Sequence, residues 1–235
     1  MQPSLFLIPV PLGKTELSKV LPPYNKEVIL SIRHFIVENV RTARRFLKQT
    51  EPAINIDELA FFLLNKHTSP EGVSELLKPI ENGYSIGIIS EAGCPAIADP
   101  GADVVAIAQH KNIKVVPLVG PSSILLALMA SGFNGQNFAF HGYLPIDGAS
   151  RTKALKTLEG RIYSENQTQL FIETPYRNMQ MVDDILKNCK PSSKLCIAAD
   201  ITLKSEFIQT LTVAEWRKKQ RPNLSKRPCL FALYK

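Results

Sequence analysis

Ser90-Glu-Ala-Gly-Cys-Pro-Ala-Ile-Ala-Asp-Pro-Gly101 is the stretch of this chain that decides its fold. It separates an apolar run, Tyr84 to Ile89, from a run typical of a helix, Ala102 to Ala108. Its two glycines and two prolines prevent the strand from continuing and the helix from beginning early. Ordinary strand-to-helix connections have about 2 to 6 residues, and this one is about twice as long. That length favours a ligand-binding loop over a plain connection, because open α/β sheets bind ligands at the carboxyl ends of their strands.

Apolar runs typical of short strands alternate with helical stretches in the first half of the chain. The strands expected there are Leu5 to Ile8, His34 to Val37, Tyr84 to Ile89 and Lys114 to Leu118. One helix is expected to begin with Ser69 as its N-cap and to be kinked near its end by Pro79. This alternation predicts a mainly parallel sheet covered by helices on both faces.

A second α/β set is expected after Gly120. Its expected strands are Phe138 to Tyr143, Gln169 to Glu173, Leu195 to Ala199 and Pro228 to Tyr234. Its expected helices are Ser122 to Met129 and stretches near Lys153 to Leu158, Met179 to Cys189 and Val213 to Lys219. We therefore predict two α/β domains, residues 1–119 and residues 120–235.

The composition is that of a globular protein. Hydrophobic residues make up 45% of the 235 residues, enough to form a core without disulfides. The first residues carry no basic leader and Pro9 interrupts their apolar stretch, so neither export nor membrane insertion is expected. The cysteines show no C-x-x-C spacing and the histidines are scattered, so we expect no metal and a cytoplasmic location. The formal net charge of +7 favours an acidic partner such as nucleic acid.

Five motifs in a fixed order resemble one known family. The loop of residues 90–101 resembles the S-D-A-G-T-P-x-x-x-D-P-G signature of the tetrapyrrole (corrin/porphyrin) methylase superfamily, most closely its ribosomal-RNA small-subunit methyltransferase I branch. Four further stretches resemble motifs of this branch. Ile8-Pro-Val-Pro-Leu-Gly13 resembles P-x-P-x-G, and Val116-Pro-Leu-Val-Gly-Pro-Ser122 resembles P-L-P-G-P-S. His141-Gly-Tyr-Leu-Pro145 resembles E-G-F-L-P, and Phe171-Ile-Glu-Thr-Pro-Tyr-Arg177 resembles F-Y-E-x-x-H-R. Each motif is weak alone, but together they extend from residue 5 to about residue 210.

This resemblance implies a two-lobed α/β fold with S-adenosylmethionine in a cleft between the lobes. A Rossmann fold is disfavoured, because the first loop, Pro9 to Gly13, has a single glycine and lacks G-x-G-x-x-G. The resemblance implies that the first lobe contacts the cofactor through Leu12, Gly13, Ser90, Ala92, Gly93, Ile97, Asp99 and Ser122. The second lobe is expected to contribute Phe171, Glu173, Ala198 and Pro228.

Methyl transfer from a sulfonium is an in-line displacement, which needs alignment and the exclusion of water but no catalytic nucleophile. A hydroxyl acceptor benefits from a base that takes its proton. Glu38 is the candidate base, because Glu38-Asn-Val-Arg41 stands where the family reads E-D-T-R. A plain ion pair between Glu38 and Arg41 is the alternative interpretation. Asn39 in place of Asp removes a second carboxylate from this segment.

A cationic stripe is expected along the helix that follows Asn39, its expected N-cap. At positions i, i+3, i+4 and i+7 it consists of Arg41, Arg44, Arg45 and Lys48. Arginine suits bidentate phosphate contacts, so the three arginines are candidates to bind an RNA substrate. A solvated helix face is the alternative. A second basic cluster, from Arg217 to Arg227, is interpreted as mainly solvated surface.

The leading hypothesis is an S-adenosylmethionine-dependent methyltransferase that acts on a ribose 2′-hydroxyl, with 16S ribosomal RNA or the small ribosomal subunit as partner. The alternative acceptor is a corrin or porphyrin precursor, whose acidic side chains would also suit the arginines. A non-catalytic RNA- or nucleotide-binding module remains open, because Asn39 and Ala199 depart from the charged pattern of the branch. The resemblance also implies a homodimer.

Overall fold

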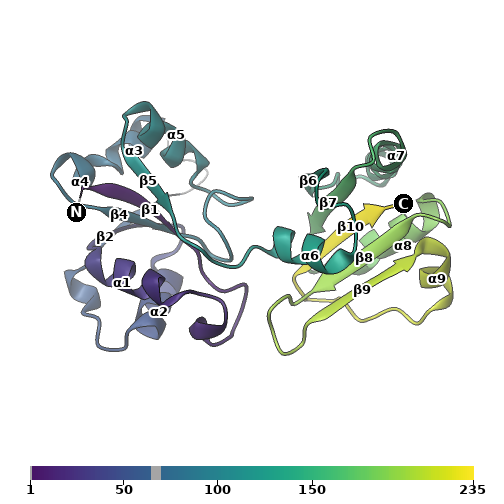
Figure 1. Ribbon diagram of the computed structural model, residues 1–235, viewed down its shortest axis with the longest axis horizontal. Helices are drawn as coiled ribbons and strands as arrows, with labels where there is room; N and C mark the ends of the chain where they lie inside the picture. The colour runs from purple at the N-terminus through teal and green to yellow at the C-terminus, as the bar shows by residue number, and fades with distance from the viewer. Residues whose placement is uncertain (1, 65–69) are drawn as a thin grey trace. The chain divides into compact units, whose positions relative to one another are not determined.

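The computed structural model describes residues 2–64 and 70–235. The chain divides into two compact units, Met1–Ser122 and Ser123–Lys235. Within the described residues, each unit contains one five-stranded sheet (Figure 1). This division falls close to the boundary expected after residue 119.

The sheet of the first unit is parallel throughout, as the alternation of strands and helices predicted. Its strands are β1 (Ser4–Ile8), β2 (His34–Val37), β3 (Ala60–Leu63), β4 (Ile86–Ile89) and β5 (Lys114–Pro117), in the order β3-β2-β4-β1-β5. Ile89 is in register with both Ile8 and Val37. The carboxyl ends of β1, β2 and β4 therefore meet at one edge of the sheet.

Helices cover both faces of this sheet (Figure 1). One face carries α1 (Pro23–Ser31), α2 (Val40–Thr50) and the short 3-10 helices η1 (Leu17–Lys19) and η2 (Ile56–Glu58). The other carries α3 (Pro70–Glu75), α4 (Lys78–Glu81) and α5 (Ala102–His110). Because successive side chains of a strand point to opposite faces, Phe35 and Val37 pack with α1 and α2, while Ile36 packs with α3 and α5.

Two details differ from the sequence expectation in this unit. The strand β3 was not expected. Pro79 does not merely kink a helix: two separate helices, α3 and α4, occupy this region, and Pro79 is the second residue of α4. The expected N-cap Ser69 lies outside the described residues.

The second unit has a mixed sheet. Its strands are β6 (Phe138–Tyr143), β7 (Thr168–Glu173), β8 (Lys194–Ala199), β9 (Phe207–Thr212) and β10 (Cys229–Tyr234), in the order β6-β7-β10-β8-β9. Its helices are α6 (Ser123–Ser131), α7 (Gly148–Ser164), α8 (Asn178–Asn188) and α9 (Val213–Lys218). β6 and β7 are parallel, and the other pairs are antiparallel. The edge strand β9 was not expected.

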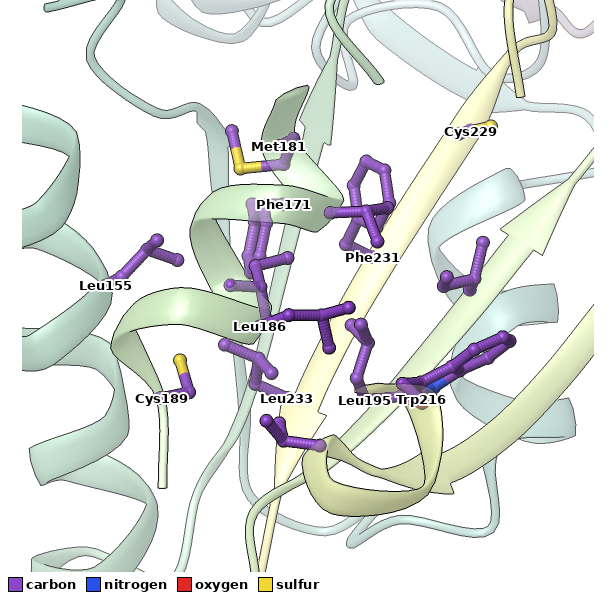
Figure 2. Packing of buried hydrophobic residues seen from close by; sticks show 14 of the residues in the cluster. Leu155, Phe171, Met181, Leu186, Cys189, Leu195, Trp216, Cys229, Phe231 and Leu233 are labelled. Atoms are coloured by element: carbon purple, nitrogen blue, oxygen red, sulfur yellow. Dashed lines mark hydrogen bonds between the residues drawn. The ribbon is translucent and has the colours of Figure 1, made fainter. Parts of the chain in front are cut away.

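The core of the second unit lies between this sheet and the helices α7, α8 and α9 (Figure 2). Phe171 and Phe231 stack on neighbouring strands with ring centroids 5.8 Å apart. Trp216 is fully buried, and its indole N–H donates to the carbonyl oxygen of Leu195 at 2.9 Å. Burial of each large apolar side chain contributes about 1.5 to 3 kcal/mol, so this cluster holds β7, β8 and β10 rigidly.

In the described part of the chain, no helix is long and apolar enough to cross a membrane.

Candidate functional site

A cavity of about 510 Å³ lies where the carboxyl ends of β1, β2 and β4 meet. Its polar lining comes from Gly13 and Lys14 after β1, Thr42, Arg45 and Gln49 on α2, and Ser90 and Glu91 after β4. Ligands of open α/β sheets bind at this edge. The cavity therefore joins the signature loop to the helix that carries the cationic stripe.

The signature loop is tied to the end of β1 by backbone hydrogen bonds. The N–H of Val10 donates to the carbonyl oxygen of Gly93 at 3.0 Å, and the N–H of Gly93 donates back at 3.1 Å. The Ser90 hydroxyl also donates to the Gly93 carbonyl oxygen, at 2.7 Å. Gly93 has φ +75°, and a Cβ atom there would lie 3.2 Å from Leu12 Cδ2 and 3.3 Å from the Pro121 oxygen. Only glycine fits this position without strain.

Two alanines of the same loop also have left-handed backbone conformations. Ala96 has φ +64° and Ala98 has φ +59°. Such a conformation costs an L-residue about 1 to 2 kcal/mol, and strain of this kind persists where the surrounding structure imposes it, often at ligand sites. The loop is thus held in a shape that its own sequence does not prefer.

Asp99 places a carboxylate oxygen in this loop without a partner. Its Oδ2 atom is buried and accepts no hydrogen bond from any described residue. Burial, and to a smaller extent the charge of Glu91, raises the pKa of Asp99 above its ordinary value. Glu91 is engaged elsewhere, because its Oε1 accepts a hydrogen bond from the Thr42 hydroxyl at 2.6 Å. A ligand with donors or positive charge would relieve the unsatisfied Asp99 carboxylate.

The predicted cofactor residues of the first unit converge on this edge. Leu12 and Gly13 follow β1, whereas Ser90, Ala92, Gly93, Ile97 and Asp99 belong to the loop after β4. Gly13 and Ser90 line the cavity. Ala92 and Ile97 are exposed, and Ser122 is the last residue of the unit. The partnerless Asp99 oxygen fits a small cationic ligand such as S-adenosylmethionine.

The predicted cofactor residues of the second unit have more varied environments. Phe171 has no exposed surface and its side chain packs in the core (Figure 2). Its contact with the cofactor stays a prediction. The carboxylate of Glu173 is buried as well, and its Oε1 accepts from Arg177 Nη2 at 2.6 Å. Ala198 is buried in β8, whereas Pro228 is exposed directly before β10. Cofactor contacts by Ala198 and Pro228 stay predictions.

Glu38 lies directly after β2, half-buried, and precedes Asn39. Asn39 is the N-cap of α2, as predicted, because its Oδ1 accepts from the N–H groups of Arg41 at 2.9 Å and Thr42 at 3.4 Å. This cap fixes the start of α2 beside the end of β2. The candidate base is thereby positioned at the same edge as the cavity.

The side chains of the cationic stripe on α2 differ in whether another group of the chain binds them. Its four members are exposed, while Ala43, Phe46 and Leu47 face the core. Arg44 forms an ion pair with Asp57 at 3.0 Å, and Lys48 donates to the carbonyl oxygens of Pro52 and Ile54. Arg45 lines the cavity. Among the described residues, Arg41 and Arg45 form no ion pair within 4.0 Å.

Arginines of the second basic cluster, from Arg217 to Arg227, bind other groups of the second unit. Arg217 donates through Nε to the carbonyl oxygen of Leu186 at 2.8 Å, which satisfies the end of α8. Arg227 donates to Asp200 at 2.7 Å, and Arg221 pairs with Asp183. Three arginines that we interpreted as solvated surface therefore tie loops of the second unit together.

Thr42 and Gln49 line the cavity but were not predicted as site residues. With Arg45 they stand at i, i+3 and i+7, which is one face of a helix. This spacing is visible in the sequence, but the interpretation of this helix rested on its charged residues, so Thr42 and Gln49 were missed. Within the described residues, no group of three or more His, Cys, Asp or Glu side chains could hold a metal ion.

Known structures share this fold. The crystal structure of the methyltransferase CobJ has a TM-score of 0.64 at 12% identity, over 99% of this chain and 94% of that one. Uroporphyrin-III C-methyl transferase from Thermus thermophilus, solved with S-adenyl homocysteine, has a TM-score of 0.57 at 15% identity, over 99% of this chain and 97% of that one. The two α/β units therefore have the fold of the tetrapyrrole methyltransferases.

Sequence relatives define the branch. The ribosomal RNA small subunit methyltransferase I of Vibrio cholerae is 30% identical over 91% of this chain and 70% of its own length. The Escherichia coli O157:H7 protein of the same name is 29% identical over 91% of this chain and 71% of its own length. No protein-family profile matches. The chain belongs to the ribosomal RNA small subunit methyltransferase I family. The predicted superfamily, fold class and S-adenosylmethionine-dependent methyltransferase activity are thereby confirmed.

Proposed function

We propose that this chain transfers a methyl group from S-adenosylmethionine to a ribose 2′-hydroxyl of small-subunit ribosomal RNA. The observation that carries the proposal is the 30% identity to a ribosomal RNA small subunit methyltransferase I, which extends over 91% of the chain. The arginine-bearing helix α2 at the rim of the cavity supports an RNA acceptor, because arginine binds phosphate well.

The signature loop and the end of β1 are the proposed cofactor site. When bound, S-adenosylmethionine supplies an activated methyl group on a positively charged sulfur. Gly13 lines the cavity and allows close approach of the ligand to the backbone, whereas Gly93 lets the loop pack closely against Leu12 and Pro121. The partnerless Asp99 oxygen accepts a donor of the cofactor and offsets its positive charge. The held shape of the loop keeps this site ordered before the ligand binds.

The acceptor side of the site is assigned to Glu38 and α2. Glu38 is the proposed base that takes the proton of the ribose hydroxyl as it attacks. Arg41 and Arg45 bind the flanking phosphates, because neither is held by an acidic partner among the described residues. Arg44 is tied to Asp57 and contributes less. The cytoplasmic location and the homodimer expected from the sequence remain part of this proposal.

A corrin or porphyrin acceptor is not favoured by any contact within the described residues. The likeness to tetrapyrrole enzymes is at 12 to 15% identity, which is a likeness of fold. The higher identity to the ribosomal RNA enzymes therefore supports ribosomal RNA as the proposed acceptor.

The test is methyl transfer from radiolabelled S-adenosylmethionine by the purified chain. Small ribosomal subunits, free 16S ribosomal RNA and a uroporphyrinogen are offered as acceptors. We expect label in the RNA of small subunits or in free RNA, at a linkage that resists alkaline cleavage because the 2′-oxygen is methylated. Label in the tetrapyrrole alone would establish the other acceptor, and label in a base would reject the ribose.

A further inference from the structure

Two exposed tyrosines end neighbouring parallel strands of the second unit. Tyr143 is the last residue of β6 and is 59% exposed. Tyr176 lies three residues after the end of β7 and is 82% exposed. Since β6 and β7 run parallel, these ends meet at one edge of the sheet. Among the described residues, Tyr176 is the most exposed large hydrophobic side chain.

A β-bulge sets the direction of Tyr143. Phe140 pairs with Leu170 and Tyr143 pairs with Ile172, so β6 has one residue more than β7 over this interval. Gly142 within the bulge has φ +63°, a conformation that glycine adopts readily. Such bulges change the direction of a side chain and are common beside functional sites.

Both tyrosines stand on anchored backbone. After Tyr143, the carbonyl oxygen of Ile146 accepts from Arg151 at 3.0 Å, and the buried Arg151 side chain is itself held by Asp184 at 2.6 Å. On either side of Tyr176, the Pro175 carbonyl accepts from the Lys226 N–H at 3.2 Å and Arg177 is paired with Glu173. Rigid presentation lowers the entropy lost when a ligand binds.

A basic groove lies beside the same edge strand. It has a volume of about 410 Å³ and is lined by His141 and Leu144 near the end of β6 and by polar residues of α7. Lys153, Thr157 and Arg161 stand at i, i+4 and i+8 along one face of that helix. No acidic residue of the described chain lines the groove, although Glu165 lies 3.9 Å from Arg161.

We propose that Tyr143 and Tyr176 form a stacking platform for unpaired bases of the substrate RNA, and that Lys153 and Arg161 in the adjoining groove bind its phosphates. Aromatic side chains beside a cationic groove are the combination that binds single-stranded nucleic acid. A protein partner would not need the cationic lining. This inference rests on the proposed function, since it names how the RNA acceptor is held.

The test measures binding of an unstructured RNA of about 12 nucleotides, by fluorescence anisotropy, to the full chain and its variants. Tyr143→Leu and Tyr176→Leu each remove an aromatic ring but keep an apolar side chain. We expect each to weaken binding about tenfold, whereas Tyr143→Phe binds like wild type because it keeps the ring. The matched control is Tyr24→Leu, which removes another exposed tyrosine, 53% exposed on α1, and should change nothing.

The groove is tested by the salt dependence of the same RNA complex. A Lys153→Ala, Arg161→Ala double variant should lower the slope of log affinity against log salt by about one to two. Wild-type affinity in both leucine variants, equal losses in Tyr143→Phe and Tyr143→Leu, or an equal loss in Tyr24→Leu would each overturn the platform. A change of oligomeric state in the leucine variants would instead place the tyrosines between copies of the chain and would also overturn it.

The platform and the proposed function fail separately. If wild type methylates small subunits but the leucine variants bind RNA normally, the platform is wrong and the function stands. If wild type leaves ribosomal RNA unmethylated while the leucine variants lose RNA binding, the platform stands and the proposed acceptor falls. Cofactor affinity, measured by calorimetry with S-adenosylhomocysteine, should be the same in all these variants.

Discussion

Asp99 in the first unit and Glu173 in the second are both carboxylates placed near the ends of strands, and each has one buried oxygen without a hydrogen-bond partner among the described residues. Their electrostatic settings are opposite. Burial alone would raise the pKa of Glu173, but the hydrogen bonds from Arg177 and from the Thr174 N–H, together with the charge of Arg177, outweigh burial, and the pKa is lowered. The pKa of Asp99 is raised by burial and by the neighbouring Glu91.

This difference separates a structural carboxylate from one available to a ligand. Arg177 supplies the positive charge that Glu173 needs, so the second unit satisfies its own motif. Asp99 has no such cation and lies in a loop that contains left-handed alanines and whose first residues, Ser90 and Glu91, line the cavity. Both motifs resemble the family in the sequence, and the counter-charge distinguishes their carboxylates.

The largest effect is expected from Arg177→Ala. This variant leaves the buried Glu173 carboxylate without its cation. Breaking a fully buried ion pair lowers the free energy of unfolding by about 3 to 5 kcal/mol. Because Arg177 is partly exposed, we expect a loss of about 2 kcal/mol. Urea denaturation at neutral pH measures the loss. Arg44→Ala is the control, because its exposed pair with Asp57 should contribute less than about 1 kcal/mol. Equal losses in the two variants would contradict the structural role of Glu173.

The pH dependence follows from the lowered pKa of Glu173. Its ion pair stabilises the fold at pH values above the ordinary glutamate pKa of about 4.3, and this stabilisation is lost as the pH falls through the lower folded pKa. The deficit of Arg177→Ala should therefore shrink in acid.

The next effect is expected from Ala92→Leu, in cofactor affinity. Ala92 is exposed between Glu91 and Gly93, so a larger side chain occupies the proposed cofactor space without entering the core. S-adenosylhomocysteine should bind at least tenfold more weakly, which corresponds to about 1.4 kcal/mol, with an unchanged unfolding midpoint. Gly93→Leu does not serve this purpose, because Gly93 is buried with φ +75° and the variant would strain the loop itself. Normal affinity in Ala92→Leu would move the cofactor elsewhere.

A smaller effect is expected on α2, in RNA binding. Removing Arg45 should lower the salt slope of RNA binding by about 0.7 to 0.9, and removing Arg41 with Arg45 should lower it by about one to two. Arg44→Ala should change the slope least, because Arg44 is held by Asp57. Cofactor affinity should not change. If Arg44→Ala lowers the slope as much as Arg45→Ala, the stripe acts as one solvated charge surface.

The smallest effect is expected in the stability of Asp99→Asn. A raised folded pKa means that wild type loses stability as the pH rises from the ordinary aspartate pKa, about 3.9, through the folded value. Asparagine cannot ionise, so the variant should gain stability relative to wild type at neutral pH and not in strong acid. Thermal unfolding at both pH values measures this, and a variant that is less stable at neutral pH would show that Asp99 has a structural partner.

Local sequence patterns predicted the parts of the fold that local chemistry determines. The alternation along the first half predicted the parallel sheet, and Asn39 was identified as a cap because its side chain bonds its own helix. The strand β3 was missed because Leu59 to Leu64 form an unbroken apolar run, which periodicity alone does not distinguish from a buried helical segment. The strand β9 was missed because its position depends on antiparallel pairing with β8.

Partners of charged side chains could not be predicted for the same reason. Arg44 lies 13 residues from Asp57, and Arg217 lies 31 residues from Leu186. Only the folded chain brings these groups together, so the sequence assigned one role to all arginines of a stripe. The burial of Phe171 could not be predicted from the sequence either, because the sequence does not show which face of β7 packs against the core.

Calorimetric titration with S-adenosylhomocysteine, compared between Asp99→Asn and Glu173→Gln, tests the contrast between the two carboxylates most directly. We predict about tenfold weaker binding in Asp99→Asn, because a hydrogen bond to a charged group is lost, and wild-type affinity in Glu173→Gln, because Glu173 serves Arg177. Wild-type affinity in Asp99→Asn together with weaker binding in folded Glu173→Gln would contradict the assignment of the cofactor site to the loop after β4.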